Sequence, residues 1–225
     1  MPIPVPDIGG DLVERTLELE ALRKLAEAAL RHRDRVELLQ NLLTVSIDAV
    51  RASGGAIHTY DQARKLLPLT VHQGMSPVFV ETVKALRLGQ SYTGKVALSR
   101  VPILIADLAN DPGLELQVLR TERLRNFASF PLLAEHRLLG VMNLFTVGDD
   151  TFSGREVEFL RTLAAQVSLS FEHVMRLEEL HDRNDELEKF NRLAVDRELR
   201  MIELKKRIRE LEILLAVQKT AETPR

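Results

Sequence analysis

The sequence predicts an α+β fold in which an antiparallel sheet is flanked by helices and long helices extend at both ends of the chain. Residues 155–223 contain neither glycine nor proline, so a single helix can run through them without a break. Residues 11–51 carry apolar side chains at helical spacing, whereas residues 56–147 carry short apolar runs separated by turn residues. Strands in the middle and helices on both sides indicate an antiparallel sheet covered by helical layers.

The pattern of the first fifty residues predicts an extended arm followed by two helices. Residues 1–10 are spaced by prolines and end in a glycine pair, which is typical of an extended arm. Asp11 and Glu14 fit an acidic version of the capping box, so a helix is expected over residues 11–32. A second amphipathic helix is expected to continue to about residue 51, where another glycine pair follows.

The central region changes to the period of strands. Serine and then proline at Ser76 and Pro77 mark the start of a helix, which is expected to end before Gly89. A short helix is also expected over residues 114–125. The expected strands are residues 56–61, 65–73, 101–106, 127–134 and 138–147, the last two forming a hairpin.

The long helix predicted near the carboxyl end starts at a capping box made by Ser153 and Glu156. If it runs to about residue 218 it is roughly 100 Å long, so a compact domain cannot bury its far half. Apolar side chains there alternate steps of three and four residues, as in a two-helix contact. This tail seam consists of Leu187, Phe190, Ala194, Arg197, Met201, Leu204, Ile208, Leu211 and Leu215.

An upstream seam has the same rhythm but is out of register with the tail seam by one residue. It consists of Leu160, Leu163, Val167, Ser170, Val174 and Leu177. We expect the upstream seam to pack on the sheet and the tail seam to pack on a partner helix. Residues 178–188 are mainly acidic and residues 197–209 mainly basic, a polarity that an antiparallel pair would use better than a parallel one.

Composition excludes several classes of function. The net charge is −2, from 31 basic and 33 acidic residues, so no nucleic acid or membrane partner is expected. The chain has no cysteine, which excludes thiolate metal sites and cysteine nucleophiles. The histidine spacing suggests no metal pair, and no nucleophile or acid–base pair can be assembled, so neither a metal, a cofactor nor an enzyme is expected. Without a secretory start or a run of about 18 apolar residues, the protein is expected to be cytoplasmic.

Three groups of residues resemble the GAF domain, a small-molecule sensor and dimerisation module of bacterial signalling proteins. They are Gly94-Lys95-Val96-Ala97 with residues 101–107, the hairpin residues 129–133 with 139–144, and residues 152–156 with the helix that follows. The resemblance covers about residues 33–176. Together with the residue patterns described above, it predicts an arm (1–10), an N-terminal helix (11–32), a GAF domain (33–176), a coiled-coil helix (177–218) and a flexible tail (219–225).

Residues 188–205 resemble a linker helix found beside sensor domains in bacterial histidine kinases. This resemblance implies a homodimer through the terminal helices and a separate output protein, such as a histidine kinase of a two-component system. His181 lacks the proline expected soon after a phospho-accepting histidine, and the sequence has no nucleotide-binding glycine loop. Dimers of the family are commonly parallel, which disagrees with the charge polarity of the tail. From the sequence we favour parallel self-association.

The residue fingerprints of known GAF ligands limit what this chain is expected to bind. Bilin attachment and free methionine sulfoxide reduction both need cysteine. The cyclic-nucleotide pattern would fall near residues 110–122, where this chain has Asn110-Asp111-Pro112-Gly113 instead, which argues against cGMP and cAMP. The resemblance places a noncovalent ligand between the sheet and the helices, with candidates Phe79, Val83, Thr93, Asp107, Leu116, Arg120, Ser129 and Asn143.

Each candidate has an ordinary alternative. Asp107 either orients a ligand donor or anchors its own loop, and the loop is favoured because aspartate beside a turn commonly bonds local backbone. Arg120 either pairs with a ligand carboxylate or phosphate, or is solvated. Phe79 and Leu116 either line a cavity or belong to the core.

The sequence therefore predicts a GAF sensor that binds an unidentified small molecule and relays through dimeric helices. The alternative is a ligand-free dimerisation scaffold whose tail captures a partner protein. A polar, solvent-filled pocket would favour the sensor, whereas a pocket packed with Phe, Leu and Met would favour the scaffold.

Overall fold

The computed structural model describes residues 8–31, 34–113, 122–147 and 152–221. The chain forms two compact units, residues 1–175 and 176–225, which are described separately. The helices are α1 (Ile8–Arg31), α2 (Arg35–Ala49), α3 (Pro77–Val83), α4 (Ser91–Ser99), the short 3-10 helix η1 (Leu108–Asn110) and α5 (Gly154–Ala221). The strands are β1 (Gly54–Thr59), β2 (Leu66–Gln73), β3 (Ala85–Arg87), β4 (Ile103–Ile105), β5 (Leu124–Ala134) and β6 (Arg137–Val147).

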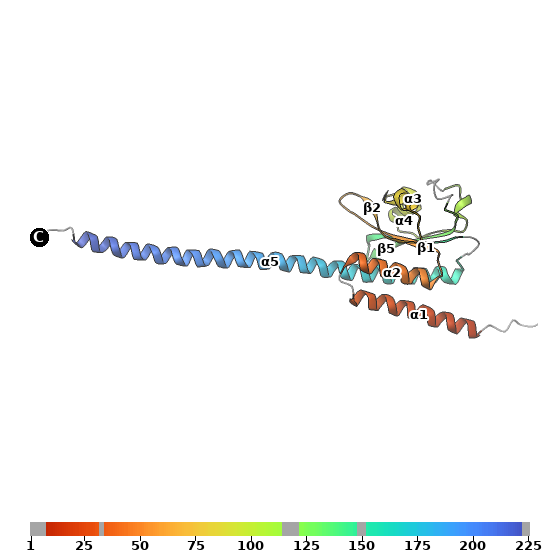
Figure 1. Ribbon diagram of the computed structural model, residues 1–225, viewed down its shortest axis with the longest axis horizontal. Helices are drawn as coiled ribbons and strands as arrows, with labels where there is room; N and C mark the ends of the chain where they lie inside the picture. The colour runs from red at the N-terminus through yellow and green to blue at the C-terminus, as the bar shows by residue number, and fades with distance from the viewer. Residues whose placement is uncertain (1–7, 32–33, 114–121, 148–151, 222–225) are drawn as a thin grey trace, which may run out of the picture. The chain divides into compact units, whose positions relative to one another are not determined.

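The strands form one six-stranded sheet in the order β3-β2-β1-β6-β5-β4. Strands β1, β2 and β5 are labelled in Figure 1. Every neighbouring pair is antiparallel. The predicted hairpin is present, because Ala134 of β5 pairs with Arg137 of β6 across the turn. These features confirm the predicted α+β class.

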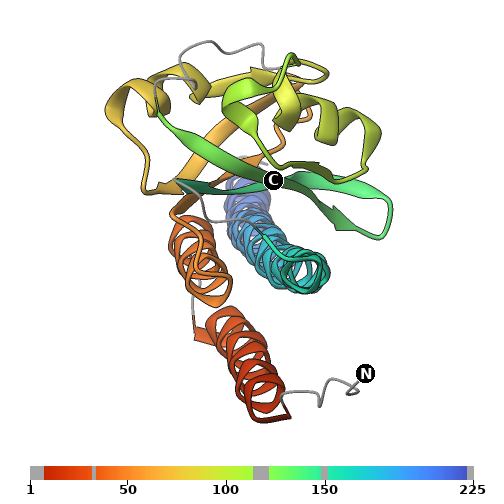
Figure 2. The same cartoon turned by 90° about the vertical axis from the view of Figure 1, so that its right-hand side faces the viewer.

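Each face of the sheet carries its own core. Helices α2, α5 and α1 lie on one side, and α3 and α4 lie on the other (Figure 2). Strand alternation divides the side chains between the two cores. On β6, Met142 and Leu144 join the core with α2 and α5, whereas Val141 and Phe145 join the core with α3 and α4.

The start of α5 is the reciprocal capping box that the sequence predicts. The Glu156 N–H donates to Ser153 Oγ at 3.2 Å, and the Ser153 N–H donates to Glu156 Oε2 at 2.7 Å. Beyond this start, Leu160, Leu163 and Val167 are fully buried in the domain core. The upstream seam therefore packs on the domain as expected, although Leu177 at its end is 51% exposed.

Both ends of the chain differ from the predicted boundaries. Helix α1 begins at Ile8, so Gly9 and Gly10 lie within a helix and do not end an arm. Glycine can adopt helical angles at a cost of about 1 kcal/mol, and no proline follows to prevent it. Helix α5 continues to Ala221, and residues 1–7 and 222–225 lie outside the described residues.

The helix predicted from Ser76 to Gly89 is wrong in its second half. Helix α3 ends at Val83, and residues 85–87 form the edge strand β3, in which Leu86 pairs with Leu67 of β2. Leu86 follows Val83 by three residues, so its spacing fits a helix, and the prediction could not separate the two cases.

Helix α4 was not expected, because no helix was predicted over residues 91–99. Its N-cap residue makes no side-chain hydrogen bond, so the usual start signal is absent. The helix predicted over residues 114–125 is wrong at its end, where Leu124 begins β5. Residues 114–121 lie outside the described residues.

The second unit consists of the continuing helix. Side chains from Glu179 to Glu212 are all exposed in the single chain. Salt bridges link neighbours along the helix, such as Arg183 to Glu179 at 2.8 Å and Arg207 to Glu210 at 3.2 Å. Within the described parts of the chain, no helix combines the length and the apolar character needed to cross a bilayer.

Candidate functional site

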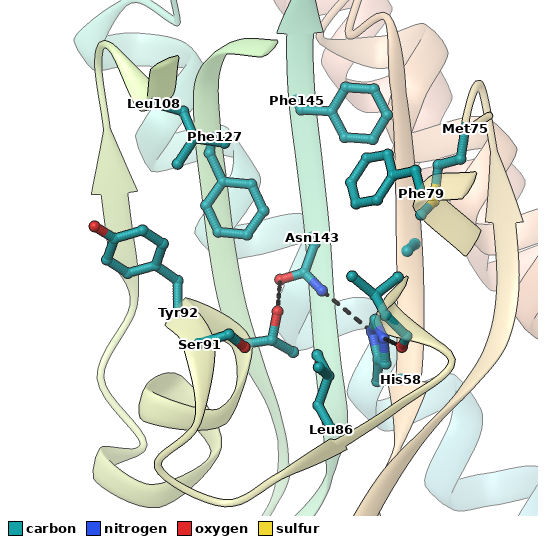
Figure 3. A pocket seen from close by; sticks show the side chains of 13 residues that line it. His58, Met75, Phe79, Leu86, Ser91, Tyr92, Leu108, Phe127, Asn143 and Phe145 are labelled. Carbon is teal, nitrogen blue, oxygen red and sulfur yellow. Dashed lines mark hydrogen bonds between the residues drawn. The ribbon is translucent and has the colours of Figure 1, made fainter. Parts of the chain in front are cut away.

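A small cavity lies between the sheet and the layer formed by α3, α4 and η1 (Figure 3). Its volume is about 30 Å³, enough for about one or two water molecules. Most of its wall is apolar, and Phe79 packs against Phe145 with ring centroids 5.7 Å apart. The lining residues are Ala56, His58, Met75, Phe79, Val83, Leu86, Ser91, Tyr92, Thr93, Leu108, Phe127, Asn143 and Phe145.

A buried polar network centred on Asn143 forms one side of the cavity (Figure 3). Asn143 Oδ1 accepts hydrogen bonds from Ser129 Oγ at 2.7 Å and from Thr93 Oγ1 at 3.3 Å. Asn143 Nδ2 donates to His58 Nδ1 at 3.3 Å, and His58 Nε2 donates to the Val83 carbonyl at 3.0 Å. This chain of bonds assigns the His58 proton to Nε2.

Strand register and a glycine bring these side chains together. Asn143 on β6 lies opposite Ala56 on β1 and opposite Ser129 on β5, two small residues that leave room for its amide. Helix α4, which carries Thr93, approaches β3 at Gly94. A Cβ added to Gly94 would lie 2.2 Å from the Arg87 carbonyl oxygen, so glycine allows the close contact.

The electrostatic character of the cavity is neutral. Burial lowers the pKa of His58 to about 4, and this outweighs the opposite effect of its hydrogen bond to Val83. His58 is therefore uncharged near pH 7. Among the described residues that line the cavity there is no Asp, Glu, Lys or Arg. The described lining suits a small, neutral, mostly apolar group, because none of these residues gives a countercharge to a phosphate or carboxylate.

Four of the predicted site residues line the cavity: Phe79, Val83, Thr93 and Asn143. Ser129 is buried directly beside them, because its hydroxyl donates to Asn143. The structure therefore brings together five of the residues that the sequence singled out. Leu116 and Arg120 lie outside the described residues.

Asp107 lies away from the cavity and bonds within its own loop. Asn110 Nδ2 donates to Asp107 Oδ2 at 2.9 Å, and Arg125 Nη1 lies 3.2 Å from the same oxygen. The hydrogen bond from Asn110, helped by the Arg125 charge, lowers the pKa of Asp107. These contacts connect the loop after β4 to the start of β5.

Sequence reasoning missed most of the wall, although a signal was present. Side chains two residues apart on a strand share a face. From Asn143 this rule points to Phe145, and from Ser129 it points to Phe127; both line the cavity. The histidine spacing suggested no metal pair, so His58 was not among the predicted site residues. Met75 and Leu108 come from loops and a short 3-10 helix, where no periodicity indicates direction.

The fold and the cavity define a compact α+β domain with a mostly apolar cavity between its sheet and one helical layer. The family model of the GAF domain matches residues 32–172. The chain therefore belongs to the GAF domain family, whose members serve signalling and ligand binding.

Solved structures support the same fold. The GAF domain of a phosphoenolpyruvate-protein phosphotransferase from Coxiella burnetii is 20% identical, with a TM-score of 0.64 over 73% of this chain and 98% of that chain. The free methionine-R-sulfoxide reductase from Neisseria meningitidis is 18% identical, with a TM-score of 0.60 over 71% of this chain and 91% of that chain. At these identities the likeness shows the fold alone. No curated protein matches the chain.

Proposed function

We propose that this protein is a non-enzymatic adaptor of bacterial signal transduction, which self-associates through the tail and connects its GAF domain to a separate output protein. The cavity supports the adaptor over the sensor, because it is small and packed with Phe, Leu and Met side chains. The absence of cysteine removes the nucleophile used by the reductase branch of the family.

The observation that carries the proposal is the exposed apolar surface of the tail. Between residues 177 and 211, large apolar side chains are 48% to 69% exposed in the single chain. Burying one such side chain fully is worth about 1.5–3 kcal/mol, so association gains a large free energy. These side chains are Leu177, Leu180, Leu187, Phe190, Leu193, Val195, Leu199, Met201, Ile202, Leu204, Ile208 and Leu211.

These side chains fall on two faces of the helix. The tail seam holds Phe190 and Leu204, and its spacing suits a second copy of the chain. A second stripe, formed by Val195, Leu199 and Ile202, lies about 150° away around the helix at 100° per residue. A two-helix contact through the seam leaves this stripe free, and we assign it to a helix of the output protein.

The resemblance of residues 188–205 to a kinase linker helix supports a histidine kinase as the output protein. The same segment contains the whole second stripe. A kinase linker helix could thus pack on the stripe while the seam holds the dimer together.

Ligand sensing is a second candidate, favoured by the polar network beside the cavity. A neutral molecule with one hydrogen-bonding group could replace a bond within the group Thr93, Asn143 and His58. Entry of such a molecule would require some of the lining side chains to move, because the cavity holds only about 30 Å³. The ligand would act through different affinities for two arrangements of the domain.

Light scattering and native mass spectrometry of the full-length protein test the proposal. We expect a dimer for the wild type, a monomer for Leu204→Asp in the seam, and a dimer for Leu199→Asp in the stripe. Both leucines are 59% exposed, which makes them a matched pair. A wild-type monomer, or equal dimerisation of both variants, would contradict the adaptor. A dimer that carries extra neutral mass would support sensing.

A further inference from the structure

The charges of the tail determine how two copies can align. Residues 178–188 contain six acidic side chains and one arginine, whereas residues 197–209 contain six basic and two acidic side chains. All side chains from Glu179 to Glu212 are exposed in the single chain. A second helix that packs on the tail seam therefore lies beside the charges that flank the seam, and complementary charges select its orientation.

A parallel, in-register pair would bring like charges together. The three- and four-residue spacing of the tail seam continues back through Arg183 to Leu180. Each seam residue of a parallel pair faces its own copy, so Arg183 and Arg197 would each oppose themselves at the centre. Arg200 would also flank Lys205 of the second copy. Like charges at such close positions destabilise the contact.

We propose that the tail pairs with a second copy in the antiparallel orientation, with Leu187 of one copy level with Leu204 of the other. The inference rests on the self-association proposed above and adds its geometry. In this alignment no seam arginine opposes an arginine. The resulting layers are Leu180 with Leu211, Arg183 with Ile208, Leu187 with Leu204, Phe190 with Met201, and Ala194 with Arg197.

The same alignment places the acidic segment level with the basic segment. Lys205, Lys206 and Arg209 come level with Glu186, Asp185 and Asp182 of the second copy. On the flank of the seam, Glu186 faces Arg207 of the second copy. Ala194 is small, so the Arg197 side chain beside it can extend its guanidinium toward the edge of the contact. Arg183 keeps its bond to Glu179 on its own helix, 2.8 Å long.

The cysteine-free chain permits a direct test of orientation. Leu187→Cys and Leu204→Cys each introduce a single thiol in the tail seam. In the antiparallel pair the two copies of residue 187 lie about 25 Å apart, whereas a disulfide needs Cα atoms about 4.4–6.8 Å apart. Oxidation of each variant alone should give no cross-link, and oxidation of the mixture should give a disulfide between residues 187 and 204.

The outcomes separate this inference from the proposed function. Cross-linking of each variant with itself would show a parallel dimer and overturn the orientation, while self-association would stand. A monomer by light scattering, with no cross-link, would overturn both. Leu199→Cys on the second stripe is the control, because its disulfide can form only by random collision. If it cross-links with the same yield as the mixture of Leu187→Cys and Leu204→Cys, the inference is also overturned. Leu180→Cys with Leu211→Cys gives a second pair if one substitution weakens the dimer.

Salt dependence provides an independent measurement on the unmodified protein. Opposite charges that face each other are weakened by salt, and like charges are relieved by it. The dissociation constant of the antiparallel dimer should therefore rise several-fold between low and high salt. A dissociation constant that falls over the same range would overturn the inference.

Discussion

Asn143 connects strands and helices that are far apart in the sequence. Its amide reaches Ser129 on β5, Thr93 on α4 and His58 on β1, and His58 in turn reaches the last residue of α3. Each of these polar side chains is nearly inaccessible to water. Because an unpartnered polar group at such a position costs about 1–3 kcal/mol, the network fixes one arrangement of the helical layer over the sheet.

His58 makes the stability of the domain depend on pH. Its pKa is lowered to about 4 in the folded state, while the unfolded chain keeps a value of about 6.5. Below about pH 6.5 the unfolded state binds a proton that the folded state does not bind, so the free energy of unfolding falls as the pH falls toward 4. The full effect of this residue is on the order of 3 kcal/mol.

His58→Gln should remove this part of the pH dependence. Glutamine can still donate a hydrogen bond toward the Val83 carbonyl, but it does not titrate. Urea unfolding measures the free energy of unfolding at pH 7.5 and at pH 5. Between these two values of pH it should fall by about 2 kcal/mol more for the wild type than for His58→Gln. His72→Gln, at an exposed position on β2, is the control and should behave like the wild type. An equal drop in all three proteins would contradict the role of His58.

At the scale of elements, the sequence predicted what local chemistry determines. The capping box at Ser153 and the hairpin formed by β5 and β6 are set by neighbouring residues, and both are present. Strand β3 and helix α4 were missed because tertiary contacts determine them. Ser91, the first residue of α4, has a φ of 57°, a conformation that no residue pattern indicates.

The candidate site, too, was predictable only where a local sequence pattern determines it. Asn143 and Ser129 were found through the resemblance, and strand alternation would have extended the list to Phe145 and Phe127. Asp107 was included although it serves its own loop, because a sequence motif does not show where a side chain points. The neutral character of the cavity depends on the burial of His58, which appears only in the folded chain.

Gly94 in α4 provides a test of how closely helix and sheet approach. A Cβ at this position would lie 2.2 Å from the Arg87 carbonyl oxygen, whereas a Cβ at Gly154 would have no atom within 4 Å. Gly94→Ala should therefore destabilise the domain by about 2 kcal/mol or more, although alanine is the better helix former. Gly154→Ala should be neutral or stabilising by up to about 1 kcal/mol. Thermal unfolding compares the two, and equal stability would mean that α4 can move away from β3.

At the scale of the whole molecule, the two units differ in what stabilises them. Residues 1–175 bury apolar side chains on both faces of the sheet. In the described part of the second unit, the side chains of residues 179–212 are all exposed within one chain. Most helical stability in proteins comes from tertiary packing, so we expect the order of the tail to be linked to the association proposed above.

This linkage predicts that hydrogen exchange in the tail depends on protein concentration. If amides between Leu180 and Leu211 exchange from the dissociated chain, their rate follows the monomer fraction, which varies with the inverse square root of concentration in a tight dimer. About a hundredfold dilution should then raise exchange in the tail about tenfold. Amides of β5 and β6 should keep their rates, because the sheet is complete in one chain. Leu204→Asp should show fast tail exchange at every concentration, and Leu199→Asp should follow the wild type. Tail protection that stays constant on dilution would instead mean that the helix is stable without a partner, and the exposed seam would need a different explanation.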